Sequence, residues 1–280
     1  MEKFFREIAE EKPVRFTARQ LYTFTNNYST CLGSGGFGEV YKGKFPNGVN
    51  VAVKVLKRSL DKRAEAQFMA EVGSICRTYH INLVRLYGFC YDHFMSALVF
   101  EYLENGSLDK YLFGKRKQIE WRKLHDIAIG TARGLAYLHE ECQHRIIHYD
   151  IKPANILLDA NFLPKVGDFG LAKLCNRDNT HISFSGYRGT PGYLAPEFLS
   201  LEERTTITTV SANPDWFPQQ LWDAYENDKL EELIVGCGIG EEDREMASRA
   251  CEVALCCVQD SPDGRPPMSA VVKMLEGELR

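Results

Sequence analysis

Three polar side chains of different chemistry lie within six residues, at Asp150, Lys152 and Asn155. A carboxylate can receive a proton from a hydroxyl group, an ammonium group can neutralise a phosphate oxygen, and an amide can bind a hard metal ion. Phosphoryl transfer uses such groups because it depends on positioning and charge neutralisation more than on covalent catalysis. A turn rich in Asp and Asn is the simpler interpretation when the segment is considered alone.

A second group of residues that suits phosphate chemistry lies upstream. Gly33, Gly35 and Gly38 would let a hairpin backbone approach phosphate oxygens, because no side chain obstructs the amide groups. This spacing alone is a weak signal, and a flexible turn is the alternative.

One lysine occurs inside an apolar strand pattern. Lys54 follows Val51 and Val53, and a buried ammonium group is costly without a partner. Glu71 is the expected partner, since it lies beside an apolar stripe of helical spacing. The alternative is that Lys54 points to solvent from an alternating strand.

Five short motifs occur together in an order and at distances that resemble those of the protein kinase family. They occupy residues 33–40, 51–54, 148–150, 168–170 and 195–197. The resemblance implies an α+β, bilobal protein kinase-like fold. It also implies transfer of the γ-phosphoryl group of Mg-ATP to a protein hydroxyl, with ATP and Mg²⁺ as cofactors.

The resemblance also implies a role for each site residue. The catalytic residues would be Asp150, Lys152 and Asn155, and the metal ligands would be Asn155 and Asp168. The nucleotide would contact Gly33, Ser34, Gly35, Gly36, Phe37, Gly38, Val40, Ala52, Lys54, Glu71, Glu101, Leu103 and Leu157. Lys152 and Thr190 resemble residues of serine/threonine kinases rather than tyrosine kinases.

Further segments narrow the resemblance to plant receptor-like kinases, and to the rust-resistance type among them. These segments are residues 84–90, 105–108, 151–159 and 268–272, and the resemblance covers nearly the whole chain. It implies a serine/threonine kinase in receptor-like, defence-related signalling. The implied partners are a protein substrate and a receptor or another kinase.

The wider pattern predicts the elements that would position these residues. Residues 28–99 read as strands with a hairpin turn at Asn47–Gly48 and one helix carrying Phe68, Val72 and Ile75. Helices dominate afterwards: one long helix has Leu124, Ile127, Ala128, Thr131, Leu135 and Leu138 on one face, and two more helices lie within 241–279. We therefore expect a lead-in over 1–27 with a short helix at 17–21, a small antiparallel-sheet N-lobe plus one helix over 28–103, and a larger helical C-lobe over 104–280.

Composition limits the other classes of function. The net charge of −4 gives no reason to expect nucleic acid as a partner. Nine cysteines without zinc-type spacing favour a reducing compartment, and no apolar run is long enough for a transmembrane helix. These features predict a cytoplasmic chain, membrane-associated only as part of a larger receptor.

Two features depart from the kinase pattern. Tyr149 replaces the arginine that grips an activation-loop phosphate in many kinases, so loop phosphorylation should matter less here. Residues 198–213 are polar and β-branched where a buried apolar helix is expected. The sequence thus predicts an internal deletion around 198–213 and a C-lobe without its central helix.

This deletion keeps other functions open beside the serine/threonine kinase. One is a catalytically impaired kinase-like binding module, or pseudokinase, that holds a nucleotide or partner without phosphoryl transfer. Another is a decayed kinase fragment without function, because loss of a central helix can cost as much as a domain's whole stability, about 5–15 kcal/mol.

Overall fold

The computed structural model describes residues 13–36, 38–56, 62–76, 78–92, 95–114, 119–176, 189–195, 197 and 217–279, with the backbone alone for 62–67 and 217–219. The chain divides into two compact units. The first unit comprises Met1–Arg116 and Tyr137–Phe184, and the second comprises Lys117–Ala136 and Ser185–Arg280. The first unit thus takes residues from both sides of the predicted lobe boundary at 103/104, which stays a prediction.

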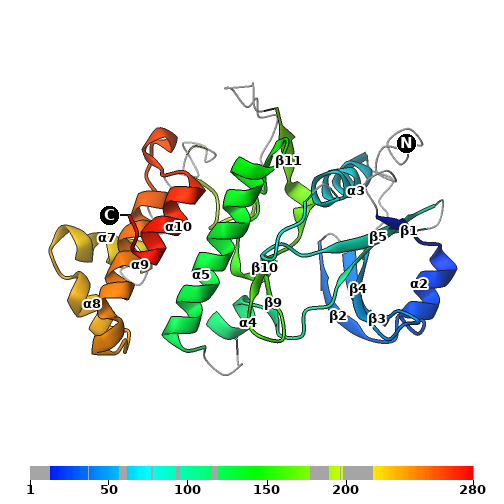
Figure 1. The fold of residues 1–280 in the computed structure, drawn as a ribbon, viewed down its shortest axis with the longest axis horizontal. Coiled ribbons are helices and arrows are strands. Elements are labelled where there is room, and N and C mark those ends of the chain that lie inside the picture. Colours follow the sequence, from blue (N-terminus) through cyan, green and yellow to red (C-terminus); the bar gives the residue numbers. More distant parts are fainter. Residues whose placement is uncertain are drawn as a thin grey trace. The chain divides into compact units, whose positions relative to one another are not determined.

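A six-stranded sheet forms the frame of the first unit (Figure 1). Its strands, in spatial order, are β1 (Val14–Arg15), β5 (Leu86–Tyr91), β6 (Ser96–Glu101), β4 (Asn50–Leu56), β3 (Gly38–Lys44) and β2 (Cys31–Gly35). All neighbouring pairs are antiparallel except β1 and β5, which are parallel. The predicted strand-rich region and its turn at Gly48, which has a φ of 89°, are confirmed.

Helix α2 (Ala18–Phe24) covers one face of this sheet. Thr17 begins the helix with a reciprocal capping box, in which its side chain accepts from the Gln20 backbone and its own backbone donates to the Gln20 side chain. Leu21 is fully buried against Val51 and Val53 of β4. The short helix predicted in the lead-in is therefore confirmed, and it contributes to the core of the first unit.

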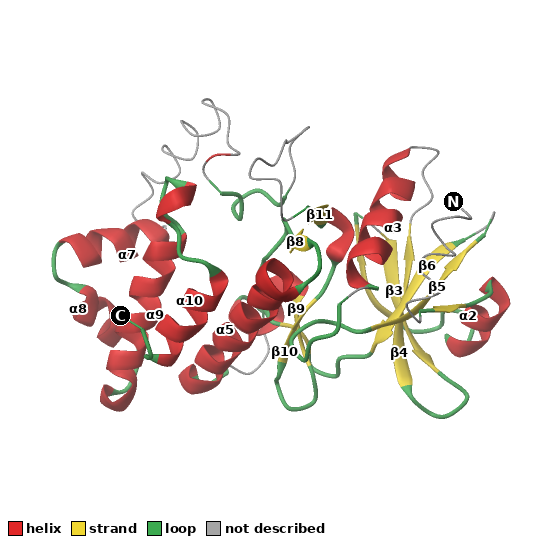
Figure 2. Ribbon diagram, turned by 45° about the horizontal axis from the view of Figure 1, so that its top comes forward, coloured by secondary structure: helices red, strands yellow, loops and turns green. Residues whose placement is uncertain are grey.

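Helix α3 (Lys62–Ile75) covers the opposite face of the sheet (Figure 2). The Phe68 ring packs 6.2 Å from Phe89 and 5.1 Å from Tyr91, both on β5. Phe68, Val72 and Ile75 are all buried, as their helical spacing predicts. The same buried side of the helix carries Glu71.

Short elements complete the first unit. They are β7 (Gly106–Ser107), α4 (Asp109–Leu112), the π-helix η1 (Tyr137–Glu141), β8 (Arg145–Ile147), the 3₁₀ helix η2 (Pro153–Asn155), β9 (Ile156–Leu158), β10 (Pro164–Val166), the 3₁₀ helix η3 (Phe169–Leu171) and β11 (Lys173–Cys175). Strands β10, β9 and β7 form one small sheet, and β11 pairs with β8 in another. These two sheets hold the ends of the loops that carry residues 148–155 and 167–170.

The second unit is helical in its described part. Its helices are α5 (Trp121–Ala136), α7 (Phe217–Glu226), α8 (Leu230–Gly236), α9 (Arg244–Cys257) and α10 (Met268–Glu276), with 3₁₀ turns η5 (Glu241–Asp243) and η6 (Pro262–Gly264). Ala132 of α5 packs with Val253 of α9 and with Val271 and Leu275 of α10. The long helix and the two late helices are confirmed. Ala128 is exposed, however, because the buried side of α5 runs through His125, Ile127, Gly130 and Ala132.

The predicted deletion around 198–213 lies outside the described residues. Beside it, the expected pair of Glu197 and Arg265 is confirmed, since the guanidinium group donates at 2.9 and 2.7 Å to the two carboxylate oxygens. This bidentate hydrogen bonding with Glu197 raises the pKa of Arg265.

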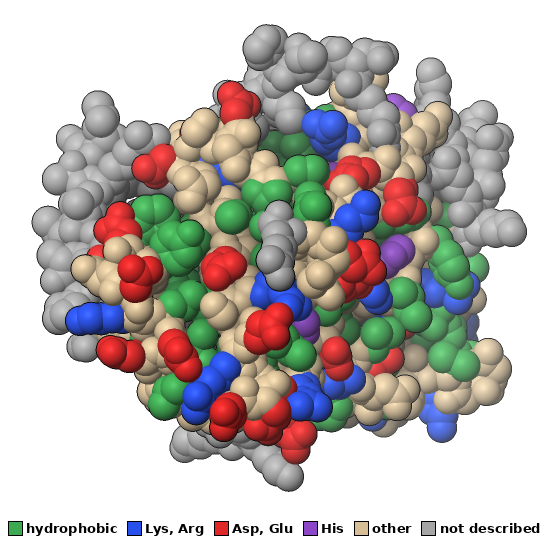
Figure 3. Space-filling view, turned by 60° about the vertical axis from the view of Figure 1, so that its left-hand side comes forward, with side chains coloured by type: hydrophobic (Ala, Val, Ile, Leu, Met, Phe, Trp, Pro, Cys, Tyr) green, Lys and Arg blue, Asp and Glu red, His purple; other side chains and the backbone are tan. Residues whose placement is uncertain are grey.

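The surface charges, the cysteines and the helices give no sign of a further specialised function in the described part of the chain. Lysine and arginine side chains are interspersed with aspartate and glutamate on the face that Figure 3 shows, without a continuous basic area among the coloured residues. All nine cysteines are free. Within the described ranges, no helix is both long and apolar enough to cross a membrane.

Candidate active site

The sheet register of the first unit gathers predicted site residues on one face. Val40 of β3 lies opposite Lys54 of β4, which in turn lies opposite Leu98 of β6. Ala52 lies opposite Phe100 in the same way. Because directly opposed residues share a face, Val40, Ala52 and Lys54 face away from the side that α2 covers.

Lys54 makes the central contacts of this face. Its ammonium group lies 2.9 and 3.0 Å from the carboxylate oxygens of Glu71 and 2.8 Å from Oδ1 of Asp168. The lysine side chain is 11% exposed and that of Glu71 is completely buried. Lys54 is therefore paired in the interior, and the alternative that it points to solvent is wrong.

Burial acts against the charged forms of Lys54 and Glu71, with different results for the two pKa values. Burial by itself lowers the pKa of Lys54, but the neighbouring Glu71 and Asp168 carboxylates outweigh it and raise that pKa. At Glu71 complete burial dominates over the attraction of Lys54 and raises the carboxyl pKa to about 7. The contacts of 2.8–3.0 Å describe a charged lysine held between two carboxylates.

The loop before β9 brings together the three residues of the first polar cluster. The Asn155 amide donates to the backbone oxygen of Asp150 at 2.8 Å and to its Oδ2 at 2.9 Å. The Lys152 ammonium donates to the same Oδ2 at 2.9 Å. Asp150 is 3% exposed, so this carboxylate is buried and held in one orientation by both neighbours.

His148 anchors this loop, a role that the sequence analysis did not assign to it. The Asp150 N–H donates to Nδ1 at 3.2 Å, so Nε2 carries the proton and donates to the Gly167 oxygen at 2.9 Å. The imidazole also packs edge-on against Phe169, with ring centres 4.8 Å apart. Burial lowers the pKa of His148, which favours this neutral form. Its position two residues before Asp150 was the available sequence signal.

Two residues of the site have backbone conformations that disfavour side chains. Tyr149 has a φ of 64° and Asp168 a φ of 60°, both in the left-handed region. Such conformations cost about 1–3 kcal/mol each and persist where the surroundings impose them. They occur directly before Asp150 and at Asp168 itself, so the backbone is strained beside one acidic residue and at the other.

Some glycines of the hairpin border open space, and one is closely packed against the neighbouring strand. A Cβ atom at Gly33, Gly35 or Gly36 would meet no atom within 4 Å, so these residues border open space. A Cβ at Gly38 would lie 2.1 Å from the Val55 oxygen, and the residue has a φ of 152°. Gly38 is therefore required by strand packing as well as by backbone freedom.

The other predicted contact residues lie around this cluster in different ways. Ser34 is exposed on β2, Leu103 is buried just after β6, and Leu157 is half-buried on β9. Phe37 lies outside the described residues. The Glu101 carboxylate accepts from Lys165 and from the Arg85 N–H, and its own N–H donates to the Arg85 oxygen at 3.0 Å, so its side chain and its N–H are already engaged.

Two side chains offer oxygen donors suited to a divalent ion. Asp168 keeps its second carboxylate oxygen beside the Lys54 contact, and Asn155 uses its amide nitrogen on Asp150, which leaves its Oδ1 for a metal. No cluster of three or more His, Cys, Asp or Glu side chains with metal-site geometry occurs in the described part of the chain. This donor set fits a small hard cation that binds few protein groups and completes its shell with phosphates and water.

The chain is similar to known proteins over most of its length. Residues 27–217 match the protein kinase domain family. The chain is 41% identical to a PR5-like receptor kinase of Arabidopsis thaliana over 95% of its own length, and 39% identical to the rust resistance kinase Lr10 of Triticum aestivum over 100%. It is 42% identical to a G-type lectin S-receptor-like serine/threonine-protein kinase of Arabidopsis thaliana over 95%.

The matches differ from the chain in length. The chain covers 44%, 48% and 33% of these three relatives, which is less than half of each. The alignment with the rust resistance kinase extends over 309 positions, although the chain has 280 residues. That relative therefore carries residues without a counterpart here.

Proposed function

The chain belongs to the protein kinase family, and on this basis we propose that it transfers the γ-phosphoryl group of ATP to serine or threonine hydroxyls of a protein substrate. The observation that supports this proposal most strongly is that two polar clusters lie within the first unit. One is Lys54 with Glu71 and Asp168, and the other is Asp150 with Lys152 and Asn155.

In this proposal each side chain has a limited task. Lys54, fixed by Glu71, binds the α- and β-phosphates of ATP. The substrate hydroxyl oxygen forms a bond to the γ-phosphorus while the bond to the β,γ-bridging oxygen breaks, and ADP leaves with that oxygen. Asp150 takes the hydroxyl proton, and Lys152 neutralises negative charge on the transferred group.

We assign Asp168 and Asn155 to Mg²⁺, because oxygen donors of this kind suit that ion. When bound, Mg²⁺ neutralises phosphate charge. The hairpin glycines Gly33, Gly35 and Gly36 leave room for the phosphates, and Val40, Ala52, Leu103 and Leu157 supply apolar contacts to the adenine.

The names of the relatives support a context for this activity. Receptor kinases and a rust resistance kinase are among them, so we propose a role in plant receptor signalling of the defence type. The kinase chain would then act in the cytoplasm, alone or as part of a membrane-bound receptor. Its partners would be a protein substrate and a receptor or second kinase.

Phosphoryl transfer is tested with radiolabelled Mg-ATP and casein as acceptor. We expect Asp150→Asn to lower the rate about 10²–10⁴-fold, the usual contribution of a positioned base. The matched control is Asp126→Asn, which changes the same charge at an exposed position of α5 and should leave the rate unchanged. Equal rates for wild type and Asp150→Asn would contradict the proposal.

A second candidate is a kinase-like module that binds nucleotide without transfer. The predicted deletion around 198–213 favours it, and the alignment with the rust resistance kinase is longer than this chain, as a deletion at some position requires. Thermal stabilisation by Mg-ATP without any transfer to casein or to the chain itself would favour this candidate over the kinase.

A further inference from the structure

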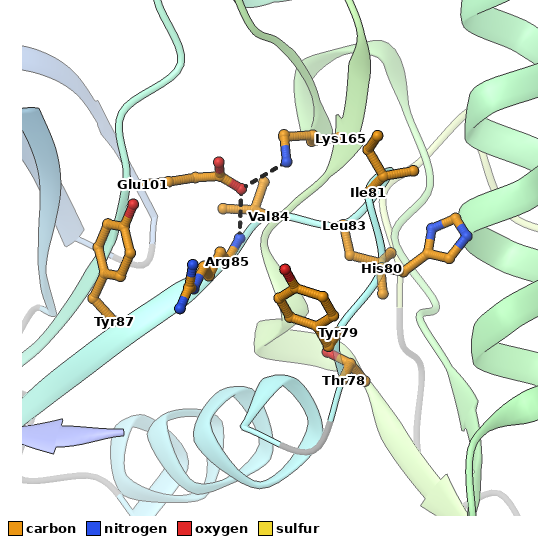
Figure 4. A pocket seen from close by; sticks show the side chains of 10 residues that line it. All are labelled: Thr78, Tyr79, His80, Ile81, Leu83, Val84, Arg85, Tyr87, Glu101 and Lys165. Carbon is orange, nitrogen blue, oxygen red and sulfur yellow. Dashed lines mark hydrogen bonds and ion pairs between the residues drawn. The ribbon is translucent and has the colours of Figure 1, made fainter. Parts of the chain in front are cut away.

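A pocket outside the two polar clusters opens on the first unit (Figure 4). It has a volume of about 290 Å³ and is lined by Thr78, Tyr79, His80, Ile81, Leu83, Val84, Arg85, Tyr87, Glu101 and Lys165. This volume lies at the lower end of the range for ligand pockets, about 300–1,000 Å³, and is large enough for a peptide side chain.

The pocket has an apolar floor and an exposed apolar rim. Leu83 and Val84 are 2% and 4% exposed and form its base. Tyr79 and Ile81 are 79% and 63% exposed at its edge. Large apolar side chains that border a concave surface are typical of binding sites.

Among the described residues, some charged side chains of the pocket have a partner of opposite charge and one does not. Glu101 accepts from the Arg85 N–H at 2.7 Å and from the Lys165 ammonium at 3.0 Å, so its negative charge is compensated inside the pocket. The Arg85 guanidinium lies 5.3 Å from the centre of the Tyr87 ring and 5.9 Å from that of Tyr79. These rings position the cation without neutralising it, and no carboxylate pairs with it among the described residues.

We propose that this pocket docks an extended segment of a partner protein in which an acidic side chain stands next to an aromatic or large aliphatic one. The acidic group pairs with Arg85, and the apolar side chain enters over Leu83 and Val84. Charge complementarity selects the acid, because Arg85 is the cation left without an anionic partner there. Arginine and tyrosine are also the residues that contribute most often to binding energy at protein interfaces.

The proposed docking is separate from nucleotide binding. Among the pocket residues, only Glu101 belongs to the predicted nucleotide contacts, and its side chain is already held by Lys165 on the pocket side. The docking can therefore be measured without nucleotide and does not depend on phosphoryl transfer.

The test uses the full chain and a fluorescein-labelled octapeptide of alanine and glycine around one aspartate–phenylalanine pair. We expect saturable binding by fluorescence anisotropy, about tenfold weaker for the peptide with asparagine in place of aspartate, the loss expected for one charge-assisted contact. Arg85→Gln should weaken binding of the aspartate peptide by the same factor. Arg19→Gln, an equal charge change at an exposed position of α2, should leave it unchanged.

Three results would overturn the proposal: no binding at millimolar peptide, equal affinity of the aspartate and asparagine peptides, or displacement of the peptide by Mg-ATP. Unchanged binding to Arg85→Gln would overturn it as well. If Arg85→Gln lowers the unfolding midpoint, Tyr79→Ala decides instead, because that side chain is largely exposed. Tyr79→Ala must then weaken binding of the aspartate peptide, and full affinity would refute the docking.

Discussion

Lys54 shows how a single buried charge is tolerated in this protein. It lies in a strand whose neighbours are buried valines, and two carboxylates from α3 and from the segment before η3 surround it. Removing one partner of such a cluster costs more than replacing the whole pair, because an uncompensated charge stays in the interior. This asymmetry allows stability to be separated from activity.

We expect Lys54→Met to abolish phosphoryl transfer and to lower the free energy of unfolding by up to about 3–5 kcal/mol, since Glu71 is left buried alone. Adding Glu71→Leu should recover part of that stability without any activity. Urea unfolding and casein phosphorylation measure the two quantities. A double variant no more stable than Lys54→Met would contradict the assigned pairing.

His148 predicts a dependence of stability on pH. Its pKa in the folded protein is lowered by burial from the ordinary 6.5. At this residue the unfolded chain therefore binds more protons than the folded chain below that pH, and the contribution of His148 to the free energy of unfolding falls as the pH drops through about 6.5. One proton contributes a slope of at most about 1.4 kcal/mol per pH unit.

Urea unfolding between pH 8 and pH 5 measures this slope. His148→Gln should show a less positive slope than wild type. A residual slope of the same sign is expected from His139, whose pKa is also lowered by burial, and one of opposite sign from Glu71, whose pKa is raised to about 7. His139→Gln serves as the companion variant. An identical slope in wild type and His148→Gln would rule out the buried neutral histidine.

At the scale of elements, the lead-in segment proves to be part of the frame that holds the site. Its strand β1 extends the sheet beside β5, and α2 covers the sheet face opposite Lys54. The capping box at Thr17 starts the helix where the sequence predicts it. Strand β4 is thereby packed on one face by α2 and carries the paired lysine on the other.

We expect Leu21→Ala to lower the free energy of unfolding by about 2–5 kcal/mol, because it leaves a cavity against Val51 and Val53. Arg19→Ala, on the exposed side of the same helix, should change it by less than about 0.5 kcal/mol. Urea unfolding of both variants measures the difference. Equal effects would mean that α2 does not pack on the sheet.

At the scale of the whole molecule, each unit has its own apolar core. The first unit contains every described residue of the candidate active site, and the second packs α5, α9 and α10 around Ala132 and Val271. The chain's three tryptophans are Trp121, Trp216 and Trp222, and the two that the structure describes, Trp121 and Trp222, belong to the second unit. Tryptophan fluorescence therefore reports the second unit, whereas the proposed nucleotide site lies in the first.

We expect Mg-ATP at about 100 times its Kd to stabilise the first unit by about 2.7 kcal/mol. Circular dichroism near 218 nm, to which the helices and strands of both units contribute, should show a transition whose midpoint rises, whereas tryptophan fluorescence follows the second unit. An equal rise by tryptophan fluorescence would mean that both units unfold as one. Asp168→Asn is the control and should reduce the rise. The absence of any cooperative transition would favour the decayed-fragment alternative.

Much of the fold and of the candidate site could be predicted from patterns of neighbouring residues. The apolar spacing of Phe68 and Val72 predicted α3, and the cost of a lone lysine predicted the partner of Lys54. The first inference succeeds because a helical period is set by residues close together in the sequence. The second succeeds because burying an unpaired charge costs so much free energy that a partner is required. The roles assigned to Asp150, Lys152 and Asn155 stay predictions, although the structure brings the three side chains together.

The sequence by itself determined the family, the main elements and the candidate chemical groups. Only the tertiary structure decided that Asp168, 114 residues from Lys54, is its second partner, that Gly38 must clear the Val55 oxygen, and that the Glu101 side chain faces Lys165. The pocket around Arg85 belongs to the same class. Sheet register and packing bring such distant segments together, and no pattern of neighbouring residues encodes which side chains then meet.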